Sequence, residues 1–465
     1  MRLFGHRPCP LDRSWSASVT PSSPRKAQAA LGSAEDPARD DLYRKIAFRV
    51  MPLLLLCYVV SFIDRTNIGI AQVRMEKDLG FSAQVYGLAV GLFFVGFIMF
   101  EVPSNMLLAR IGARKTLLRI MVSWGVVTIL TSLATTPVLF SMARFMLGVA
   151  EAGFFPGALF YLAQWFPSAR RTRMTALFFL GVPLSGIIGP PLSGWIMHSF
   201  GGVLGLHDWQ WLFVLEGIPP VLLGLAVFFL FPDRPAEAGW LSAEEKRAVI
   251  ADLAADQEHK GGAERHGSVL RALRDPRVYV LGLVSCGAYT LANAVSFWTP
   301  TIIKTAGVGD VLDIGLLAAI PPILGMAVML VVGRHSDRTL ERRWPAAGAE
   351  FVAACCLVAL SFATGSAYVV IVLLAVMTAA HYSGLTVFYS IPSIYLSGPA
   401  AAGGIAMVTT MGSFAAATSP AMLGWIKTTT GSLDLGLQIS AGVVALGGVI
   451  LLLGIPAQAL RERPT

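Results

Sequence analysis

The sequence predicts an all-α membrane protein with about twelve transmembrane helices in two pseudo-symmetric six-helix bundles. Of its 465 residues, 55% are hydrophobic and only 14% are charged, and the mean hydropathy is +0.65. A soluble domain is nearer half apolar and a quarter charged. The apolar runs are long and do not alternate, which favours helices over a transmembrane β-barrel. Similar cationic connections also recur in the two halves of the chain.

The expected spans follow one another with short polar connections between most of them. Each is an apolar run of about 20 residues, the length that crosses a bilayer core as a helix. They cover residues 46–70, 84–108, 116–135, 138–164, 172–198, 211–231, 277–303, 312–334, 346–364, 368–396, 402–427 and 435–460.

Alternate connections between the spans differ in charge. One set is cationic and contains Arg110, Arg114, Lys115, Arg119, Arg170, Arg171, Arg173, Arg334, Arg338, Arg342, Arg343, Arg461 and Arg463. The other set, around residues 135, 198–208, 310, 364 and 434, is nearly free of cations. Because cationic loops stay on the cytoplasmic side, both termini are expected in the cytoplasm.

Polar stretches divide the chain into four parts. Residues 1–41 are rich in Pro, Ser, Ala and Arg and lack an apolar core, so we expect a disordered cytoplasmic tail and not a signal peptide. Residues 42–231 form the N-terminal six-helix bundle, 232–274 a cytoplasmic linker, and 275–465 the C-terminal six-helix bundle. Within the linker, Ser242 followed by acidic residues predicts a short amphipathic surface helix.

Several classes of protein are excluded by what the sequence lacks. The net charge of +8 is spread over connections between spans, so no nucleic-acid partner is expected. The five cysteines have neither paired nor metal-ligand spacing, and we expect no disulfide, metal or other cofactor. No nucleophile elbow, zinc-binding helix, dinucleotide fingerprint or ATP phosphate loop is present, so the chain is expected to be neither an enzyme nor an ATP-driven pump. We expect it to act as a monomer in the lipid bilayer.

Asp64 and Arg65 stand side by side inside the first span, in FIDRTNIGIA. Ionisable groups at membrane depth cost ~2.5 to 3.5 kcal/mol each on insertion scales, so they usually face a water-filled path for ions or substrate. Successive helical residues point about 100° apart, so each can meet a different partner. A mutually neutralising structural pair, or a position at headgroup level, stays open as the alternative.

The two halves resemble each other after their second spans. NMLLARIGARK in the first half corresponds to GRHSDRTLERR in the second. A cationic cluster at matching positions in two six-helix halves is typical of a duplicated transporter. Arg110, Arg114, Asp337 and Arg338 are therefore the candidate gating residues.

Five strings in a fixed order carry a resemblance to one family: FIDRTNIGIA, EVPSNMLLARIGARK, RFMLGVAEAGFFPG, DWQWLFVLEGIP and FPDRPAEAGWLSAEEKRAV. From about residue 42 onward the chain resembles the major facilitator superfamily. Within it, the chain is similar to the anion:cation symporter family of tartrate, sugar-acid, phthalate and hydroxyphenylacetate permeases. The resemblance implies proton-driven uptake of a small organic anion by alternating access between two bundles.

The resemblance also implies roles for four residues. The family's acid and cation of the first span fall on Asp64 and Arg65, and its fourth-span pair falls on Arg144 and Glu151. The latter two are seven residues apart, about two helical turns, and so lie on one face. An arginine fork matches a carboxylate, so we expect Arg65 to hold the substrate. Asp64 and Glu151, with Arg144 nearby, are expected to carry protons; a structural network involving Arg144 and Glu151 is the alternative.

The chain departs from the family pattern at a few positions. Asn105 and Ala109 stand where the superfamily's loop motif has Gly and Asp. Thr409 and Ser413 stand where sugar-acid members commonly have Asn.

Polar and aromatic residues of the second half complete the expected substrate site. They are Asn293, Trp298, Tyr382, Thr409 and Ser413. They allow either a hydroxy or sugar acid or an aromatic carboxylate. Tryptophan in a span can instead serve packing or anchor the helix at the interface, and that alternative stays open.

Two further features leave questions open. His381 can titrate near neutral pH, or it can be a neutral core residue. LGVPLSGIIGPPLSGW, residues 180–195, predicts close helix packing and bending. It partly resembles the Gly-Pro motif of drug/proton antiporters. A proton-coupled drug or metabolite exporter is therefore the second candidate function, and sequence alone leaves a channel open.

Overall fold

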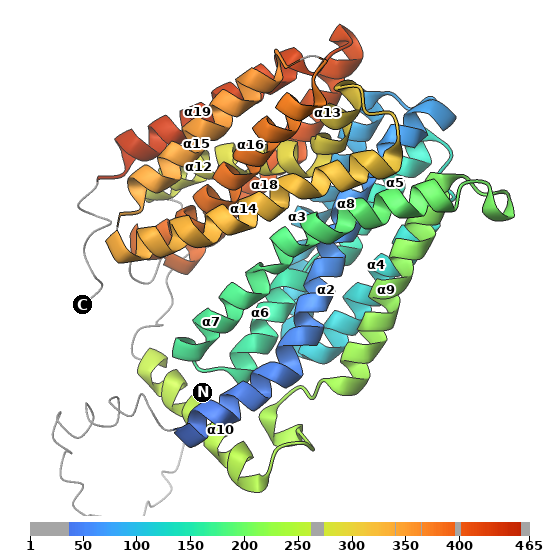
Figure 1. Cartoon of the computed structure of the whole chain (residues 1–465). Coiled ribbons are helices and arrows are strands. Elements are labelled where there is room, and N and C mark those ends of the chain that lie inside the picture. The colour runs from blue at the N-terminus through green and yellow to red at the C-terminus, as the bar shows by residue number, and fades with distance from the viewer. Residues whose placement is uncertain (1–36, 262–273, 340, 364, 396–400, 457–465) are drawn as a thin grey trace, which may run out of the picture. The chain divides into compact units, whose positions relative to one another are not determined.

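A computed structural model describes residues 37–261, 274–339, 341–363, 365–395 and 401–456 (Figure 1). The regular elements among these residues are all helices and include no strand, as the long apolar runs predict. Contacts divide the chain into two compact units, residues 1–46 and 47–465, and the second contains both bundles from residue 47 onward. Most of the predicted tail lies outside the described residues, but helix α2 already begins at Pro37.

The N-terminal half consists of the helices that precede the linker. They are α2 (Pro37–Asp78), α3 (Ala83–Ile111), α4 (Ala113–Thr131), α5 (Pro137–Glu151), α6 (Phe154–Trp165), α7 (Ser168–Phe179), α8 (Gly181–Ser199), η1 (Val203–Gly205) and α9 (Asp208–Leu230). Helix α4 packs against α9 and α5, and α3 packs against α5.

The C-terminal half repeats this arrangement after the linker elements η2 (Pro235–Glu237) and α10 (Ala243–Gly261). It contains α12 (Pro276–Asn293), η3 (Ala294–Trp298), α13 (Thr299–Thr305), α14 (Val311–Thr339), α15 (Arg343–Leu360), α16 (Ala367–Phe388), α17 (Ser390–Tyr395), α18 (Ala401–Thr430) and α19 (Asp434–Gly454). Helix α15 packs against α16 and α19 as α4 packs against α5 and α9, and α14 packs against α16 as α3 packs against α5.

Ten helical segments of the described chain are long and apolar enough to cross a membrane. Four of them combine elements: α5 with α6, α7 with α8, α12 with α13, and α16 with the start of α17. Helices α4 and α18 are not among these ten segments, but they coincide with the third and eleventh predicted spans. The first turns of α4 carry Arg114, Lys115 and Arg119, which lowers its apolar content. The helices therefore confirm the predicted all-α fold of two six-helix bundles.

The two halves meet where α3 packs on α18 and α8 packs on α14 (Figure 1). Glycines let the backbones approach closely: a Cβ on Gly87 would lie 2.2 Å from the carbonyl oxygen of Pro420, and one on Gly315 would lie 2.3 Å from that of Pro190. Small residues permit such contact in membrane bundles. The close packing predicted for residues 180–195 is thus confirmed.

The predicted linker helix is also confirmed. In α10 the Ser242 Oγ accepts a hydrogen bond from the Glu245 N–H at 3.1 Å, while the Glu245 side chain accepts one from the Ser242 N–H at 2.7 Å. This reciprocal arrangement is a capping box, which satisfies two backbone donors at the helix start.

The fourth span is broken in its middle, which the sequence analysis did not predict. Helix α5 ends at Glu151, and α6 starts after Gly153, whose φ is 90°. Residues other than glycine rarely adopt this left-handed backbone. A Cβ here would also lie only 2.3 Å from the Ser104 Oγ of α3. The break therefore places Glu151 at a helix end inside the bundle.

Candidate functional site

An ion pair between α2 and α5 forms the centre of the candidate site. The Arg65 Nη2 donates a hydrogen bond to the Glu151 Oε1. The Glu151 side chain is 1% exposed and that of Arg65 is 19% exposed. Arg65 thus meets an acid from another helix and not its neighbour Asp64, as the divergence of successive helical residues predicts.

Three phenylalanines surround the Arg65 guanidinium. Its Cζ lies 4.8 Å from the ring centre of Phe62, 5.3 Å from that of Phe93 and 5.5 Å from that of Phe97. Aromatic faces attract cations and exclude water, so they hold the guanidinium in place while keeping its surroundings apolar. This strengthens the attraction between the cation and any carboxylate that reaches it.

Asp64 lies in the interior of the N-terminal bundle. Its two carboxylate oxygens accept hydrogen bonds from Thr128 of α4 at 3.0 Å and from Asn67 at 3.4 Å. The buried Arg144 guanidinium interacts electrostatically with both Asp64 and Glu151, and its Nη2 donates to the Arg65 carbonyl oxygen at 3.4 Å. The four charged residues singled out in the sequence therefore lie together in one half.

Several polar atoms of this cluster have no partner in the described part of the chain. They are the Nε atoms of Arg65 and Arg144 and the Oε2 of Glu151, all buried. Buried donors and acceptors are nearly always satisfied in proteins. A free Nε beside a paired Nη2 is the geometry that a second carboxylate oxygen would complete.

Two acids near the cluster were missed as site residues in the sequence. Glu101 of α3 interacts electrostatically with Arg65. Glu216 of α9 is buried, and its Oε1 accepts a hydrogen bond from the Ser193 Oγ of α8 at 2.7 Å. Each is a lone acid in an apolar span, which is the signal that could have identified it.

Tyrosines of the C-terminal half lie opposite the Arg65 cluster. The hydroxyl groups of Tyr289 and Tyr389 are 3.2 Å apart. Tyr289 also interacts electrostatically with Glu101 and with Tyr58, two residues of the N-terminal half. A small cavity lined by Tyr289, Tyr389 and Thr409 lies beside this pair. The tyrosine hydroxyl groups of the C-terminal half thus lie near Glu101 and Tyr58, which both interact with Arg65.

The remaining substrate-site candidates lie in different surroundings, and their predicted roles stay predictions. The Asn293 Nδ2 donates to the Ala416 carbonyl oxygen at 3.0 Å and to the Ser419 Oγ at 2.9 Å, both on α18. Trp298 is fully buried, with its ring edge-on to Tyr86 of α3 at 5.2 Å between ring centres.

The other three positions are spread over the C-terminal half. The Tyr382 hydroxyl lies against Gly186 of α8. Ser413 is half-buried on α18. His381 shares a small cavity with Glu350 of α15.

The gating candidates lie at the C-terminal ends of α3 and α14 and at the start of α4. Arg110 and Arg338 are exposed. Arg114 is held by its own half and by the start of the linker: its N–H donates to Asp233 at 2.9 Å, and its Nε donates to the carbonyl oxygen of Phe228. The side chain of Asp337 lies outside the described residues. No three His, Cys, Asp or Glu side chains gather as a metal site would require, within the described ranges.

Residues 54–420 match the Major Facilitator Superfamily. The chain belongs to this superfamily. The "Putative metabolite transport protein NicT" of Pseudomonas putida is 42% identical over 421 residues, which cover 90% of this chain and 96% of the relative. A "Putative tartrate transporter" of Agrobacterium vitis is 43% identical, covering 88% and 93%. A "Quinolone resistance transporter" of Acinetobacter baumannii is 37% identical, and the match covers 91% of this chain and 96% of the relative.

The fold is also that of solved superfamily structures. A crystal structure of a D-xylose-proton symporter superimposes with a TM-score of 0.68 at 16% sequence identity, covering 88% of this chain and 98% of that one. The protein is therefore a multi-pass membrane transporter of the bacterial inner-membrane type and not an enzyme. These relatives are consistent with the resemblance of the chain to the anion:cation symporter family.

Proposed function

We propose that this transporter imports a small organic anion together with protons. The observation that supports this most directly is the Arg65–Glu151 ion pair, whose guanidinium is surrounded by phenylalanine rings. A substrate carboxylate can replace the Glu151 carboxylate on this guanidinium. Arginine keeps its charge at any accessible pH and binds a carboxylate with two parallel hydrogen bonds. The substrate would therefore use the Nη2 that Glu151 now occupies and the Nε that has no partner in the described chain.

The coupling to protons follows from this competition. When a substrate carboxylate takes Arg65, Glu151 loses its hydrogen-bonded cation while it stays buried. A buried carboxylate without a cation is costly, and taking up a proton removes that cost. Substrate and proton are then loaded together, and both leave together when Glu151 returns to Arg65. Asp64 and Arg144 complete the charge balance of the cluster.

We propose a hydroxy acid or a sugar acid as the substrate. An aromatic carboxylate is the alternative among small organic anions. The Tyr289, Tyr389 and Thr409 hydroxyl groups opposite the cluster suit substrate hydroxyls. The tartrate-transporter name of one relative supports the same class.

We also propose the orientation that the positive-inside rule predicts, with both termini and the linker of residues 232–274 in the cytoplasm. Cysteines placed at exposed sites test it. A membrane-impermeant thiol reagent added to intact cells should label a cysteine at Leu204, between α8 and α9, and should not label one at Glu237.

Proteoliposomes test the function. Purified protein should accumulate L-tartrate or hydroxyphenylacetate when the outside is acid and the inside neutral, and a protonophore should abolish accumulation. The neutral diamide of tartrate should be neither transported nor inhibitory. Transport without dependence on the pH gradient would contradict proton coupling, and transport of no carboxylate would contradict the substrate class.

A proton-coupled exporter is the second candidate, favoured by the 37% identity to the quinolone resistance transporter. Vesicles of opposite orientation separate the two functions. An exporter would concentrate a quinolone into inside-out vesicles when their interior is acid, and Arg65→Ala would leave that activity largely intact. An importer of carboxylates would not concentrate the quinolone, and Arg65→Ala would abolish its carboxylate transport.

A further inference from the structure

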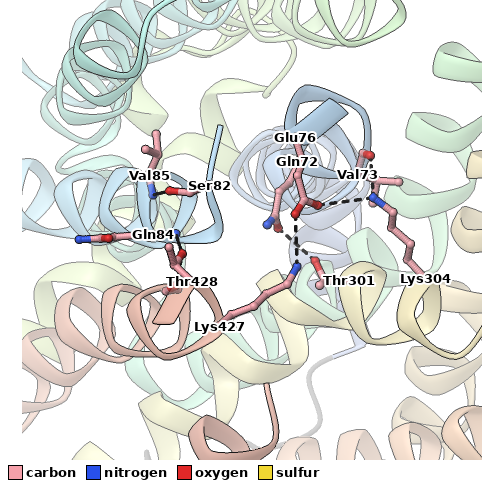
Figure 2. A network of polar contacts seen from close by, with 11 residues as sticks. Gln72, Val73, Glu76, Ser82, Gln84, Val85, Thr301, Lys304, Lys427 and Thr428 are labelled. Carbon is pink, nitrogen blue, oxygen red and sulfur yellow. Dashed lines mark hydrogen bonds and ion pairs between the residues drawn. The ribbon is translucent and has the colours of Figure 1, made fainter. Parts of the chain in front are cut away.

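Two lysines from the C-terminal half bind one carboxylate from the N-terminal half near the end of α2 (Figure 2). The Lys304 Nζ of α13 lies 3.5 Å from the Glu76 Oε2, and the Lys427 Nζ of α18 lies 3.8 Å from the Glu76 Oε1. The Lys304 Nζ also donates to the Val73 carbonyl oxygen at 3.0 Å. This end of the helices carries the cation-poor connections and is the outer end in the proposed orientation.

Other bonds close the same end. The Thr301 Oγ1 donates to the Gln72 Oε1 at 3.0 Å, and the Gln84 N–H donates to the Thr428 Oγ1 at 2.9 Å (Figure 2). All of them join the two halves. Alternating access requires that these bonds break whenever the transporter opens outward.

A second side-chain contact between the halves lies at this end, where the His198 Nδ1 is 3.5 Å from the Asp310 Oδ2. The backbone N–H of Leu312 donates to Asp310 at 2.7 Å and lowers the pKa of this carboxyl, so Asp310 stays charged in mild acid. This contact joins one imidazole to one carboxylate, whereas at Glu76 two ammonium groups share one carboxylate.

The charges of the Glu76 cluster are unevenly divided between the halves. Outward opening would take the only carboxylate of the cluster away with the N-terminal half. The C-terminal half would keep two ammonium groups that had shared it. Lys427 is 15% exposed and Lys304 is 37% exposed, so both are near the surface but partly desolvated. Two neighbouring cations that lose their counterion attract an anion from solution.

We propose that Lys304 and Lys427 form an outer docking site for the carboxylate of the transported anion, and that Glu76 fills this site while the outer end is closed. The carboxylate of Glu76 is an internal stand-in for the substrate group. The inference rests on the proposed function, since it takes the transported anion as the ligand. Anion and Glu76 exclude each other, and Glu76 binds only in the closed form, so an outside anion favours opening.

Outside kinetics distinguish a docking site from a simple latch. Glu76→Gln frees the lysines and should lower the outside KM for L-tartrate in proteoliposomes. Lys304→Gln and Lys427→Gln should each raise it, by about fivefold, the effect of one partly exposed ion pair. Lys77→Gln is the matched control, because Lys77 is exposed on the same turn as Glu76 and should leave KM unchanged. If these residues formed only a latch, Glu76→Gln, Lys304→Gln and Lys427→Gln would all shift KM in the same direction. That result would overturn the proposal.

A second measurement does not depend on transport. In full-length Glu76→Gln, a membrane-impermeant acetylating reagent is added with or without malonate, and modification of each lysine is measured by mass spectrometry. Malonate should slow modification of Lys304 and Lys427 and not that of Lys77. If wild-type protein transports no carboxylate but malonate protects these two lysines, the proposed function fails while the anion site stands. If transport occurs and no lysine is protected, the docking site is wrong.

Discussion

The two halves of the transporter share a helical plan but bury different chemistry. The N-terminal half buries opposite charges in contact, with Arg65 on Glu151 and Arg144 near Asp64. The C-terminal half buries Glu350 and His381 beside one small cavity, and no ion pair to either is present among the described residues. Its contribution near the centre is hydroxyl groups such as that of Tyr289.

This difference separates the tasks of the two halves. Opposite charges in a desolvated site can exchange partners, because a new anion or a proton can replace the old contact at small net cost. An isolated buried acid or imidazole has no such exchange available. We therefore expect proton and carboxylate chemistry in the N-terminal half, and orientation of the substrate by hydrogen bonds in the C-terminal half.

The largest effect is expected for Arg65→Ala. The variant should lower tartrate uptake about 100-fold, because removing one partner of a buried charge pair costs about 2 to 5 kcal/mol. Arg65→Lys should recover only part of the activity, since lysine lacks the planar fork. Uptake into proteoliposomes is the measurement, and Lys115→Ala, at an exposed cation of α4, is the control. Retained affinity in Arg65→Ala would mean that the carboxylate docks elsewhere.

Glu151→Gln should uncouple transport from protons. The variant has no proton to exchange at this position, so accumulation driven by a pH gradient should vanish while exchange of labelled for unlabelled substrate continues. Both assays use the same proteoliposomes. Glu237→Gln, at an exposed acid of η2, should keep both activities. Accumulation that survives in Glu151→Gln would assign the proton to another group, with Asp64 and Glu216 the first candidates.

A smaller effect is expected in the other half. Tyr289→Phe removes one hydroxyl group that faces the Arg65 cluster and should raise the KM for tartrate about 2-fold to 10-fold, the value of one hydrogen bond. The coupling ratio of protons to substrate should not change. Tyr368→Phe, at a tyrosine that is 80% exposed, is the control. If Tyr289→Phe altered the coupling ratio instead, the division between the halves would be wrong.

Much of the fold and of the charged cluster follows from the sequence. The apolar runs predict the helices. The adjacent charges Asp64 and Arg65 inside a span indicate a functional site, because ionisable groups at membrane depth are costly. The resemblance to the family adds Arg144 and Glu151. The pairing of these charged side chains did not follow from the sequence. Arg144 and Glu151 share a helix face, yet Glu151 bonds to Arg65, since the break at Gly153 ends α5 beside α2.

Other placements depend on packing that no local pattern records. Trp298 lies between the halves against Tyr86, which follows from the position of η3 and not from the residue type. Lys304 and Lys427 are 123 residues apart and resemble ordinary interfacial lysines at helix ends. Only the meeting of α13, α18 and α2 brings them to Glu76. A costly charge is visible within the sequence of one span, whereas the pairing of charges from distant helices depends on how those helices pack.

The smallest effects are expected at the buried acid and imidazole of the C-terminal half. Glu350 lies against Gly447 of α19, and we expect it and His381 to stay uncharged throughout the cycle. Glu350→Gln keeps the shape of an uncharged side chain, so it should leave uptake, its pH profile and thermal stability nearly unchanged. His381→Gln should likewise leave the pH profile in place. A shifted profile in either variant, measured as uptake against outside pH, would give the C-terminal half a titrating group and end the assignment of proton chemistry to one half.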